Sequence, residues 1–260
     1  MVVNGVVNGK KLKPRVVAVI QARMRSKRLP GKAMLDLAGR PLLAHVIDRA
    51  QHIEGVDAVV VATSIGEENA PLIELARSMG ADVFVGSVDN VLERYYLSAV
   101  EFGGDFIVRV TGDNPFTDPE YASMAVEIAM ESSADLCSLT RLPLGTAVEI
   151  IKREALEEAY RLHDKPYHRE HVTPYIKEHP ELFRIERPAA NIRNPYPNLR
   201  LTVDTADDFR LASAIYDALY QGGIIPLAEI IQYLKKHPGL LELNAGVAQR
   251  PMSHAENPNA

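Results

Sequence analysis

The chain alternates between short apolar runs and longer segments in which apolar residues recur every three or four positions. The short runs are rich in Val, Ile and Ala, which is typical of buried parallel strands. They are residues 16–20, 57–64, 82–85, 106–110 and 135–140. The longer segments have the periodicity of amphipathic helices, at 67–79, 91–102 and 121–130. This alternation predicts an α/β fold with a doubly wound, mostly parallel sheet.

The pattern changes after residue 140. Residues 141–198 are rich in Pro and His and lack a clear period, which predicts an insertion that carries specificity or a dimer interface. A strand at 199–203 and a helix at 206–220 are expected to resume the regular fold. We therefore expect one domain over residues 15–243. The polar, aperiodic ends, 1–14 and 244–260, are predicted to be a flexible extension and a flexible tail.

Composition narrows the class of protein. A chain of 260 residues with 47% hydrophobic residues is long enough for one substantial domain. Its single cysteine, Cys137, excludes an intramolecular disulfide and suits a reducing cytosol, so we expect a cytoplasmic protein. No apolar run approaches the roughly 20 residues of a membrane span. A net charge of −5 argues against nucleic acid as the main partner.

A strongly basic segment, Q-A-R-M-R-S-K-R-L-P-G-K at 21–32, follows the first predicted strand. In open α/β sheets, ligands bind at the carboxyl ends of the strands, and clustered Arg and Lys side chains suit a ligand with several phosphates. The spacing matches neither the Walker pattern nor the dinucleotide fingerprint. A solvated basic loop remains the alternative. Its cations are Arg23, Arg25, Lys27, Arg28 and Lys32.

Two acidic turns follow other predicted strands. Asp113 lies in R-V-T-G-D-N-P at 109–115, and Asp204 lies in L-T-V-D-T-A-D-D at 201–208. Carboxylates in these places are suitable ligands for the magnesium ion of a bound triphosphate. Asp is also a common turn residue, and Asp204 or Thr205 can equally be a helix N-cap, with Asp207 and Asp208 in the first turn.

The basic segment at 21–32 resembles the N-terminal signature of cytidylyltransferases of the spore-coat polysaccharide type, which are related to the CMP-activating synthetases for KDO and sialic acids. The resemblance implies a Rossmann-like nucleotidyltransferase fold of the glycosyltransferase-A-like type. It also implies Mg²⁺-dependent transfer of CMP from CTP to a small anionic acceptor, with release of pyrophosphate. We expect an acidic or modified sugar for a surface polysaccharide as the acceptor, and a homodimer as the assembly.

The resemblance assigns roles to particular residues. It implies that Arg23, Lys32 and Asp113 act in catalysis, and that Asp113 and Asp204 hold Mg²⁺. Asp207 is expected to be an outer-sphere partner of the metal or a helix cap. The residues expected to bind the nucleotide are Gln21, Ala22, Arg23, Ser26, Lys32, Asn90 and Asp113.

Two segments of the predicted insertion resemble family motifs near the acceptor pocket. They are G-T-A-V-E at 145–149 and R-E-H-V-T at 169–173, and they make Glu149, Arg169, Glu170 and His171 candidate acceptor-binding residues. The alternative is that residues 169–171 only open a helix. The spacing of His163, His168 and His171 fits no zinc motif that we considered.

Alternative functions remain at this point. One is a nucleotidyltransferase that uses another nucleoside triphosphate or a non-sugar acceptor such as a phosphonate. Another is a non-catalytic nucleotide-binding regulatory protein. The joint presence of Asp113 and Asp204 favours an enzyme, because binding alone would not require both metal carboxylates. No covalent intermediate is required, so Cys137 is expected to be an apolar strand residue and not a nucleophile.

Overall fold

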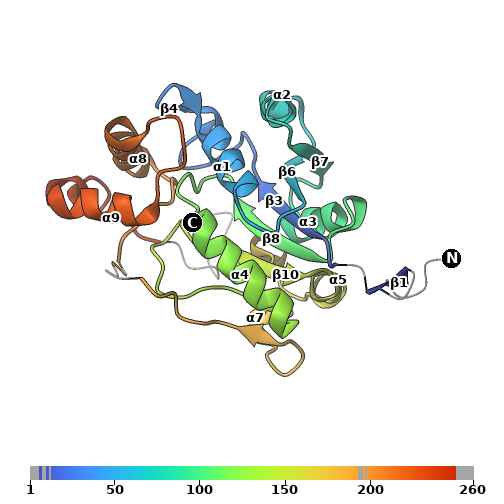
Figure 1. Ribbon diagram of the computed structural model, residues 1–260. Helices are drawn as coiled ribbons and strands as arrows, with labels where there is room; N and C mark the ends of the chain where they lie inside the picture. Colours follow the sequence, from blue (N-terminus) through green and yellow to red (C-terminus); the bar gives the residue numbers. More distant parts are fainter. Residues whose placement is uncertain (1–5, 8–9, 12, 193–195, 197, 250–260) are drawn as a thin grey trace.

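A computed structural model describes residues 6–7, 10–11, 13–192, 196 and 198–249. Its centre is a seven-stranded sheet of order β11-β9-β10-β8-β3-β6-β7 (Figure 1). The strands are β3 (Val16–Gln21), β6 (Ala58–Ser64), β7 (Asp82–Gly86), β8 (Phe106–Thr111), β9 (Leu136–Cys137), β10 (Glu149–Lys152) and β11 (Ile185–Glu186). Two separate strand pairs are β1 (Val6–Val7) with β2 (Lys10–Lys11), and β4 (Asp36–Leu37) with β5 (Arg40–Pro41).

The sheet is mostly parallel, as the sequence pattern predicted. Strand β3 pairs in parallel with β6 and β8, and β6 pairs in parallel with β7. Strand β10 is antiparallel to both β8 and β9, which makes the sheet mixed. The central strands are buried on both faces, which explains their nearly continuous apolar sequences. The predicted α/β class is therefore confirmed.

Two hydrophobic cores cover the two faces of the sheet (Figure 1). One core joins alternate strand residues such as Ala18 and Ile20 to α1, α2, α4, α8 and α9. The other joins Val17 and Val19 to α3, α5 and α7. The longer helices are α1 (Leu42–Gln51), α2 (Ala70–Ser78), α3 (Val91–Glu101), α4 (Pro119–Ser132), α5 (Arg153–Leu162), α8 (Ala206–Leu219) and α9 (Leu227–Lys236). Shorter helical segments are α6 (Pro166–His171), α7 (Pro174–Glu178), η1 (Lys32–Met34), η2 (Glu67–Asn69) and η3 (Pro238–Leu243). No helix of the described residues is long and apolar enough to cross a membrane.

The structure corrects three details of the predicted elements. Residues 141–198 are more regular than expected, because they contain β10, β11 and the helices α5, α6 and α7. The strand expected at 199–203 does not form; among the described residues, the β-pairing of this buried segment is limited to one isolated bridge between Leu144 and Arg200. Helix α9 was not predicted.

The ends of the chain also differ from a plain tail. Asn244, which begins the predicted flexible tail, is buried and hydrogen-bonded to the domain, and Gln249 contacts Arg200. Residues 1–5, 8–9, 12 and 250–260 of the two predicted flexible ends lie outside the described residues.

The carboxyl ends of β3 and β8 bring the basic and acidic segments together. The Gly112 N–H donates to the Gln21 carbonyl at 2.8 Å. A Cβ at Gly112 would lie 2.8 Å from that oxygen and 2.9 Å from the Ala22 Cβ, so glycine is needed here for close contact between two loops. The Val203 N–H donates to the Asp113 carbonyl at 2.8 Å, which joins the two acidic segments directly.

Candidate functional site

The basic segment after β3 is a closed loop with fixed ends. Gly31 has a φ of +69°, and its N–H donates to the Met24 carbonyl at 3.0 Å. The Met24 N–H donates to the side-chain oxygen of the buried Asn69 at 2.9 Å, and the Asn69 amide donates to the Ser64 carbonyl. The loop is therefore held at the strand ends, and Asn69 is a supporting residue that the sequence did not reveal.

Lys32 lies between the two predicted metal carboxylates. Its Nζ is 2.7 Å from Asp113 Oδ2 and 3.0 Å from Asp204 Oδ1, and it donates to the Val203 carbonyl at 2.9 Å. The side chains of Lys32 and Asp204 are each 14% exposed. In this arrangement the Lys32 ammonium attracts both carboxylates and offsets one of their two negative charges.

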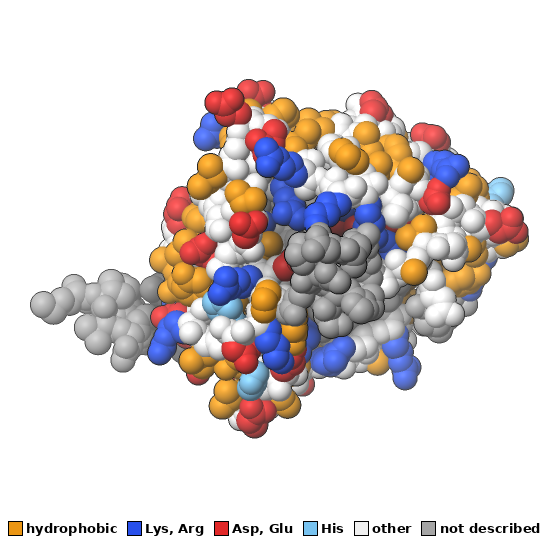
Figure 2. All heavy atoms as spheres, turned by 180° about the vertical axis from the view of Figure 1, so that it is seen from behind, with side chains coloured by type: hydrophobic (Ala, Val, Ile, Leu, Met, Phe, Trp, Pro, Cys, Tyr) orange, Lys and Arg blue, Asp and Glu red, His pale blue; other side chains and the backbone are white. Residues whose placement is uncertain are grey.

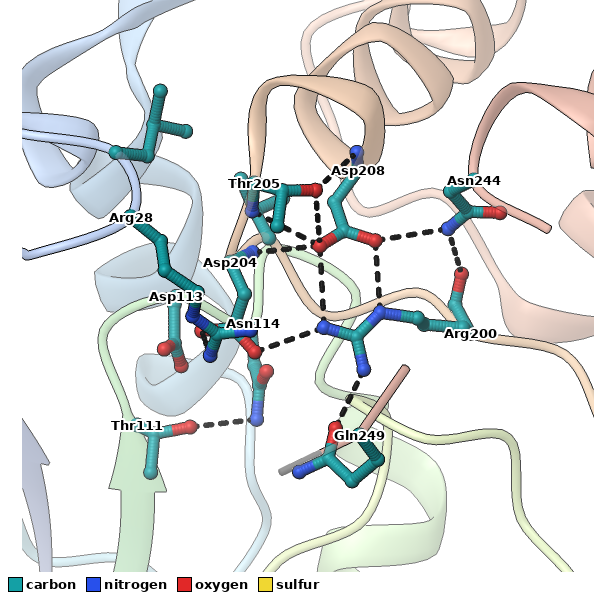
Figure 3. A network of polar contacts seen from close by, with 12 residues as sticks. Arg28, Thr111, Asp113, Asn114, Arg200, Asp204, Thr205, Asp208, Asn244 and Gln249 are labelled. Atoms are coloured by element: carbon teal, nitrogen blue, oxygen red, sulfur yellow. Dashed lines mark hydrogen bonds and ion pairs between the residues drawn. The ribbon is translucent and has the colours of Figure 1, made fainter. Parts of the chain in front are cut away.

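Two further cations contact Asp204 (Figure 3). Arg28 Nη2 is 2.9 Å from Asp204 Oδ1, and Arg200 Nη2 is 2.9 Å from Oδ2. Burial alone would raise the pKa of Asp204, but Lys32, Arg28 and Arg200 outweigh burial and hold the pKa below its usual value. Asp204 is therefore an ionised carboxylate at neutral pH.

Asp208 fixes Arg200 from the first turn of α8. Asp208 accepts hydrogen bonds from Arg200 Nε at 2.8 Å and from the backbone N–H groups of Asp204 and Thr205, both at 3.0 Å. The Thr205 hydroxyl in turn accepts from the Asp208 N–H, which completes a capping box. The neighbouring Asp207 instead pairs with Arg210 on the surface. Asp207 therefore does not contact Asp204 or Arg200. The helix-capping role that we expected for Asp207 belongs to Asp208.

The C-terminal segment also contacts this network. Asn244 Nδ2 donates to the Arg200 carbonyl at 3.1 Å and to Asp208 Oδ1 at 3.0 Å, and Arg200 Nη1 donates to the Gln249 side chain (Figure 3). Hereafter we call the following group the Asp204 cluster: Arg28, Lys32, Asp113, Arg200, Asp204 and Asp208.

The Asp204 cluster has the donor chemistry of a magnesium site. Asp113 and Asp204 provide carboxylate oxygens close enough together for one cation, Lys32, to contact both. Mg²⁺ in nucleotide sites is commonly held by one or two carboxylates together with phosphate oxygens and water. The described residues contain no group of three or more His, Cys, Asp and Glu side chains able to hold a metal. The residues therefore fit a metal that arrives with phosphate ligands, and they do not form a closed protein cage.

The other predicted nucleotide residues surround the same strand ends. Arg23 is exposed, and its charge lies close enough to Arg94 to lower the pKa of that buried guanidinium, although burial is the larger cause. Asn90 caps α3 by accepting from the Glu93 N–H at 3.0 Å, and Ser26 accepts from the Leu29 N–H at 3.4 Å. In this structure Asn90 and Ser26 thus stabilise local turns. Arg25 forms an ion pair with Glu68 at the surface.

A second ion cluster lies on the face of the sheet that α3, α5 and α7 cover. Arg109 Nη1 donates to Glu149 Oε2 at 2.9 Å across the paired strands β8 and β10. The Thr173 hydroxyl lies 3.1 and 3.2 Å from the two Glu149 oxygens, and Lys177 forms an ion pair with Oε1. Burial would raise the pKa of Glu149, but Arg109 and Lys177 outweigh it and lower the pKa. We call these four residues the Glu149 cluster.

The predicted acceptor-binding residues separate into two groups. Glu149 belongs to the Glu149 cluster, and His171 lies close enough to Arg109 and Lys177 for them to add to the effect of burial, which lowers the pKa of His171. Arg169 instead donates to His163 Nε2 at 2.9 Å on the exposed side of α6, and Glu170 is also exposed. The structure therefore places His171 near Arg109 and Lys177, the two cations that pair with Glu149. Arg169 instead contacts His163, and Glu170 lies close enough to His171 for its charge to oppose the lowering of the His171 pKa.

The junction between α6 and α7 has a strained backbone. Val172 has φ 72° and ψ −56°, and the Thr173 N–H donates to the His171 carbonyl at 2.9 Å, which is the geometry of a γ-turn with positive φ. Positive φ is unfavourable for a β-branched residue. Val172 is fully buried, and the turn directs Thr173 toward Glu149. Such strain is found preferentially at functional sites.

Lys and Arg side chains form a group on one face of the molecule, around the middle of the face that is visible in Figure 2. Away from the strand ends, a cavity of about 650 Å³ lies between α4 and the loop after α1. Its lining includes Glu54, Ser123 and Glu127, and it contains none of the residues that the sequence predicted for the site. The ion clusters therefore define the candidate site better than that cavity does.

Several known proteins are similar to this chain in sequence or structure. A family model described as cytidylyltransferase matches residues 17–233. The spore coat polysaccharide biosynthesis protein SpsF of Bacillus subtilis is 32% identical over 236 residues, which cover 86% of this chain and 95% of that protein. A 3-deoxy-manno-octulosonate cytidylyltransferase of an Anaeromyxobacter species is 38% identical over 130 residues, or 49% of this chain and 51% of that protein. The solved structure of a cytidylyltransferase from Leptospira borgpetersenii has a TM-score of 0.81 and 28% identity, and the match covers 88% of this chain and 97% of that one.

Proposed function

Because the chain belongs to the cytidylyltransferase family, we propose that it transfers CMP from CTP to a sugar acid and releases pyrophosphate. The reaction is a displacement at the α-phosphorus of CTP by an oxygen of the acceptor. Negative charge grows on the phosphorus and on the departing pyrophosphate, so the site must supply positive charge at the strand ends.

The observation that carries the proposal is the position of Lys32 between Asp113 and Asp204. A cation already occupies the place between the two carboxylates, and the Lys32 and Arg28 side chains are cationic groups that suit phosphate oxygens. In the proposed reaction Lys32, Arg28 and Arg23 bind the triphosphate. The Gln21 and Ala22 backbone, at the end of β3, is proposed to contact the nucleotide.

The two carboxylates would then hold a divalent cation. Asp113 and Asp204 are the proposed ligands of Mg²⁺, and Arg200 and Asp208 keep the Asp204 carboxylate oriented. Bound there, the metal would neutralise charge that builds up on the phosphates during transfer.

The acceptor class rests on the relatives and on the Glu149 cluster. The relatives include a protein named for spore coat polysaccharide biosynthesis and a 3-deoxy-manno-octulosonate cytidylyltransferase, and both names point to sugar activation. Residues 141–198 provide Glu149, Thr173 and Lys177, which supports an acceptor-binding role for this segment. A homodimer and a cytoplasmic location, which suits the free thiol of Cys137, belong to the same proposal.

The test is a pyrophosphate-release assay over nucleotides and acceptors. CTP, UTP, ATP and GTP are each combined with Mg²⁺ and a panel of sugar acids, sugar phosphates and phosphonates. We expect release with CTP and a sugar acid, and loss of release in Asp113→Ala. Nucleotide binding without release from any pair would instead support a regulatory binding protein.

A further inference from the structure

Arg109 has an unused hydrogen-bonding edge. Its Nη1 is bound to Glu149, but neither Nε nor Nη2 has a hydrogen-bond partner among the described residues, and Nε is buried. Nε and Nη2 lie on the same edge of a guanidinium, and together they form the two-pronged donor that matches a carboxylate. Arg109 lies on β8, outside the proposed phosphate-binding loop.

The guanidinium of Arg109 is held in a fixed plane. Glu149 binds one end of it, and the Tyr95 ring lies beneath it with the guanidinium carbon 6.0 Å from the ring centre. The Tyr95 hydroxyl donates to the Val110 carbonyl at 2.9 Å, which fixes the ring in turn. The side chain of Arg109 keeps 17% exposure as a whole, although its Nε is buried. A preorganised donor pair of this kind loses little entropy when it binds a ligand.

The charges around Arg109 favour one negative charge on the ligand. Arg109 and Lys177 are two cations that share a single carboxylate, Glu149, so the Glu149 cluster carries one excess positive charge. Burial is the main cause that lowers the pKa of His171, the titratable neighbour from α6; Arg109 and Lys177 lower it further, and Glu170 opposes them. Asp113 also lies close to Arg109, but it pairs with Lys32. A monoanion balances this cluster, whereas a dianion does not.

A second buried group lies on the same face of the sheet. Gln21 on β3 pairs with Thr111 on β8, two residues beyond Arg109, so the side chains of Gln21 and Arg109 point to the same side. The side-chain oxygen of Gln21 is buried and has no donor among the described residues. An unmade hydrogen bond at such an atom costs free energy, which a ligand hydroxyl would recover.

We propose that Arg109 is a specificity-determining residue of the acceptor site: its Nε and Nη2 bind the acceptor's carboxylate, and Gln21 accepts a hydrogen bond from a hydroxyl of the same molecule. This inference rests on the proposed function and narrows its acceptor to hydroxylated monocarboxylates, against phosphonates and sugar phosphates. Glu149 is then a positioning residue. Its two oxygens are already occupied by Arg109, Lys177 and Thr173, so it holds the cations in place and does not contact the sugar.

The test measures binding in the absence of chemistry. A non-reactive α,β-methylene analogue of CTP is bound first, and isothermal titration then follows 3-deoxy-manno-octulosonate and other sugar acids, their carboxamides, and 2-hydroxyethylphosphonate. The variants are Arg109→Lys, which keeps the charge but removes the two-pronged donor, and the control Arg161→Lys on the exposed side of α5. Tight binding of a carboxylate is expected to weaken about 20-fold or more in Arg109→Lys, with carboxamide binding changed less than about threefold. The control should match the wild type.

Several results would overturn the inference. They are unchanged carboxylate binding in Arg109→Lys, an equal loss for carboxylate and carboxamide, binding of the phosphonate in preference to every carboxylate, and binding of no panel member while the CTP analogue binds. Failure of the proposed function looks different. In that case the CTP analogue does not bind, or a bound carboxylate yields no pyrophosphate when CTP replaces the analogue.

Discussion

The Asp204 cluster and the Glu149 cluster lie at the same edge of the sheet but balance their charges differently. In the Asp204 cluster three cations face three carboxylates, so the cluster is neutral before any ligand binds. In the Glu149 cluster two cations share one carboxylate. A triphosphate therefore needs an added cation at the first cluster, whereas a monoanionic acceptor needs none at the second. This difference supports the proposal that a divalent metal binds on the nucleotide side of the site.

The largest expected effect comes from removing a proposed metal ligand. Asp113→Asn should lower kcat for pyrophosphate release by about 1,000-fold or more, because the neutral amide cannot help to hold the metal at the reacting phosphate. Asp207→Asn is the matched control, since Asp207 pairs with Arg210 at the surface, and it should retain wild-type kcat. Equal kcat values in the two variants would contradict the assignment of the metal to the Asp204 cluster.

The next effect is on stability. Asp208→Asn should destabilise the protein by about 3 kcal/mol, because it breaks a buried ion pair and removes one of the two carboxylates that pair with Arg200. Chemical denaturation would measure the free energy of unfolding, with Asp207→Asn expected within about 0.5 kcal/mol of the wild type. A loss of free energy of unfolding well below this value in Asp208→Asn would mean that Asp204 and Gln249 are enough to hold Arg200.

The competition between Lys32 and a metal gives a smaller effect. Without nucleotide, Lys32→Met should bind Mn²⁺ about tenfold more tightly than the wild type, because the ammonium between the two carboxylates is gone. Binding of CTP should weaken in the same variant. Electron paramagnetic resonance of free Mn²⁺ measures the affinity directly. Weaker Mn²⁺ binding in Lys32→Met would show that Lys32 does not compete with the metal.

The pH dependence of stability follows from the depressed carboxylates. The pKa values of Asp204 and Asp208 are lowered in the folded state, so their contribution to stability is present above the unfolded pKa of about 3.9 and is lost as pH falls through the folded values. The free energy of unfolding should therefore fall below about pH 4. In Asp208→Asn this acid-dependent loss should be smaller. If the free energy of unfolding fell equally steeply with pH in the wild type and in Asp208→Asn, Asp208 would not contribute to the acid-dependent loss of stability.

The smallest effect is expected at Cys137. It is buried in β9 with its side chain in the core on the face of the sheet opposite the Glu149 cluster, and burial raises the pKa of its thiol to about 11. Cys137→Ala should leave kcat within about twofold, and the native protein should resist alkylation at pH 8. A large loss of kcat with intact folding would indicate a nucleophile and would contradict direct transfer.

The contrast between the clusters also explains what the sequence could predict. Lys32, Asp113 and Asp204 were predictable because each lies in a local motif directly after a buried segment. The role of Asp208 could also have been predicted from the sequence, because Asp208 lies three residues after Thr205, which is the spacing of a capping box. Arg200 was missed because a lone Arg in an apolar segment gives no signal of the partner that it meets.

The Glu149 cluster was harder to predict because its members come from separate elements. Arg109, Glu149 and Lys177 lie on β8, β10 and α7, and only the pairing of β10 with β8 brings the first two together. Strand β10 has four residues and runs antiparallel, so its pattern is weak within the segment that we expected to be irregular. The prediction of a strand at 199–203 was wrong because an apolar, buried segment does not always pair with a neighbouring strand. The apolar residues of this segment are buried, but among the described residues it pairs through a single bridge.

The most direct test of the central claim is to follow the phosphorus atoms of CTP. The protein is incubated with Mg²⁺, a sugar acid that supports turnover, and CTP labelled at either the α- or the γ-phosphorus. Transfer of CMP predicts that α-label appears in the acceptor product and that γ-label leaves entirely as pyrophosphate. Transfer of γ-label to the acceptor, or a product without α-label, would contradict the account.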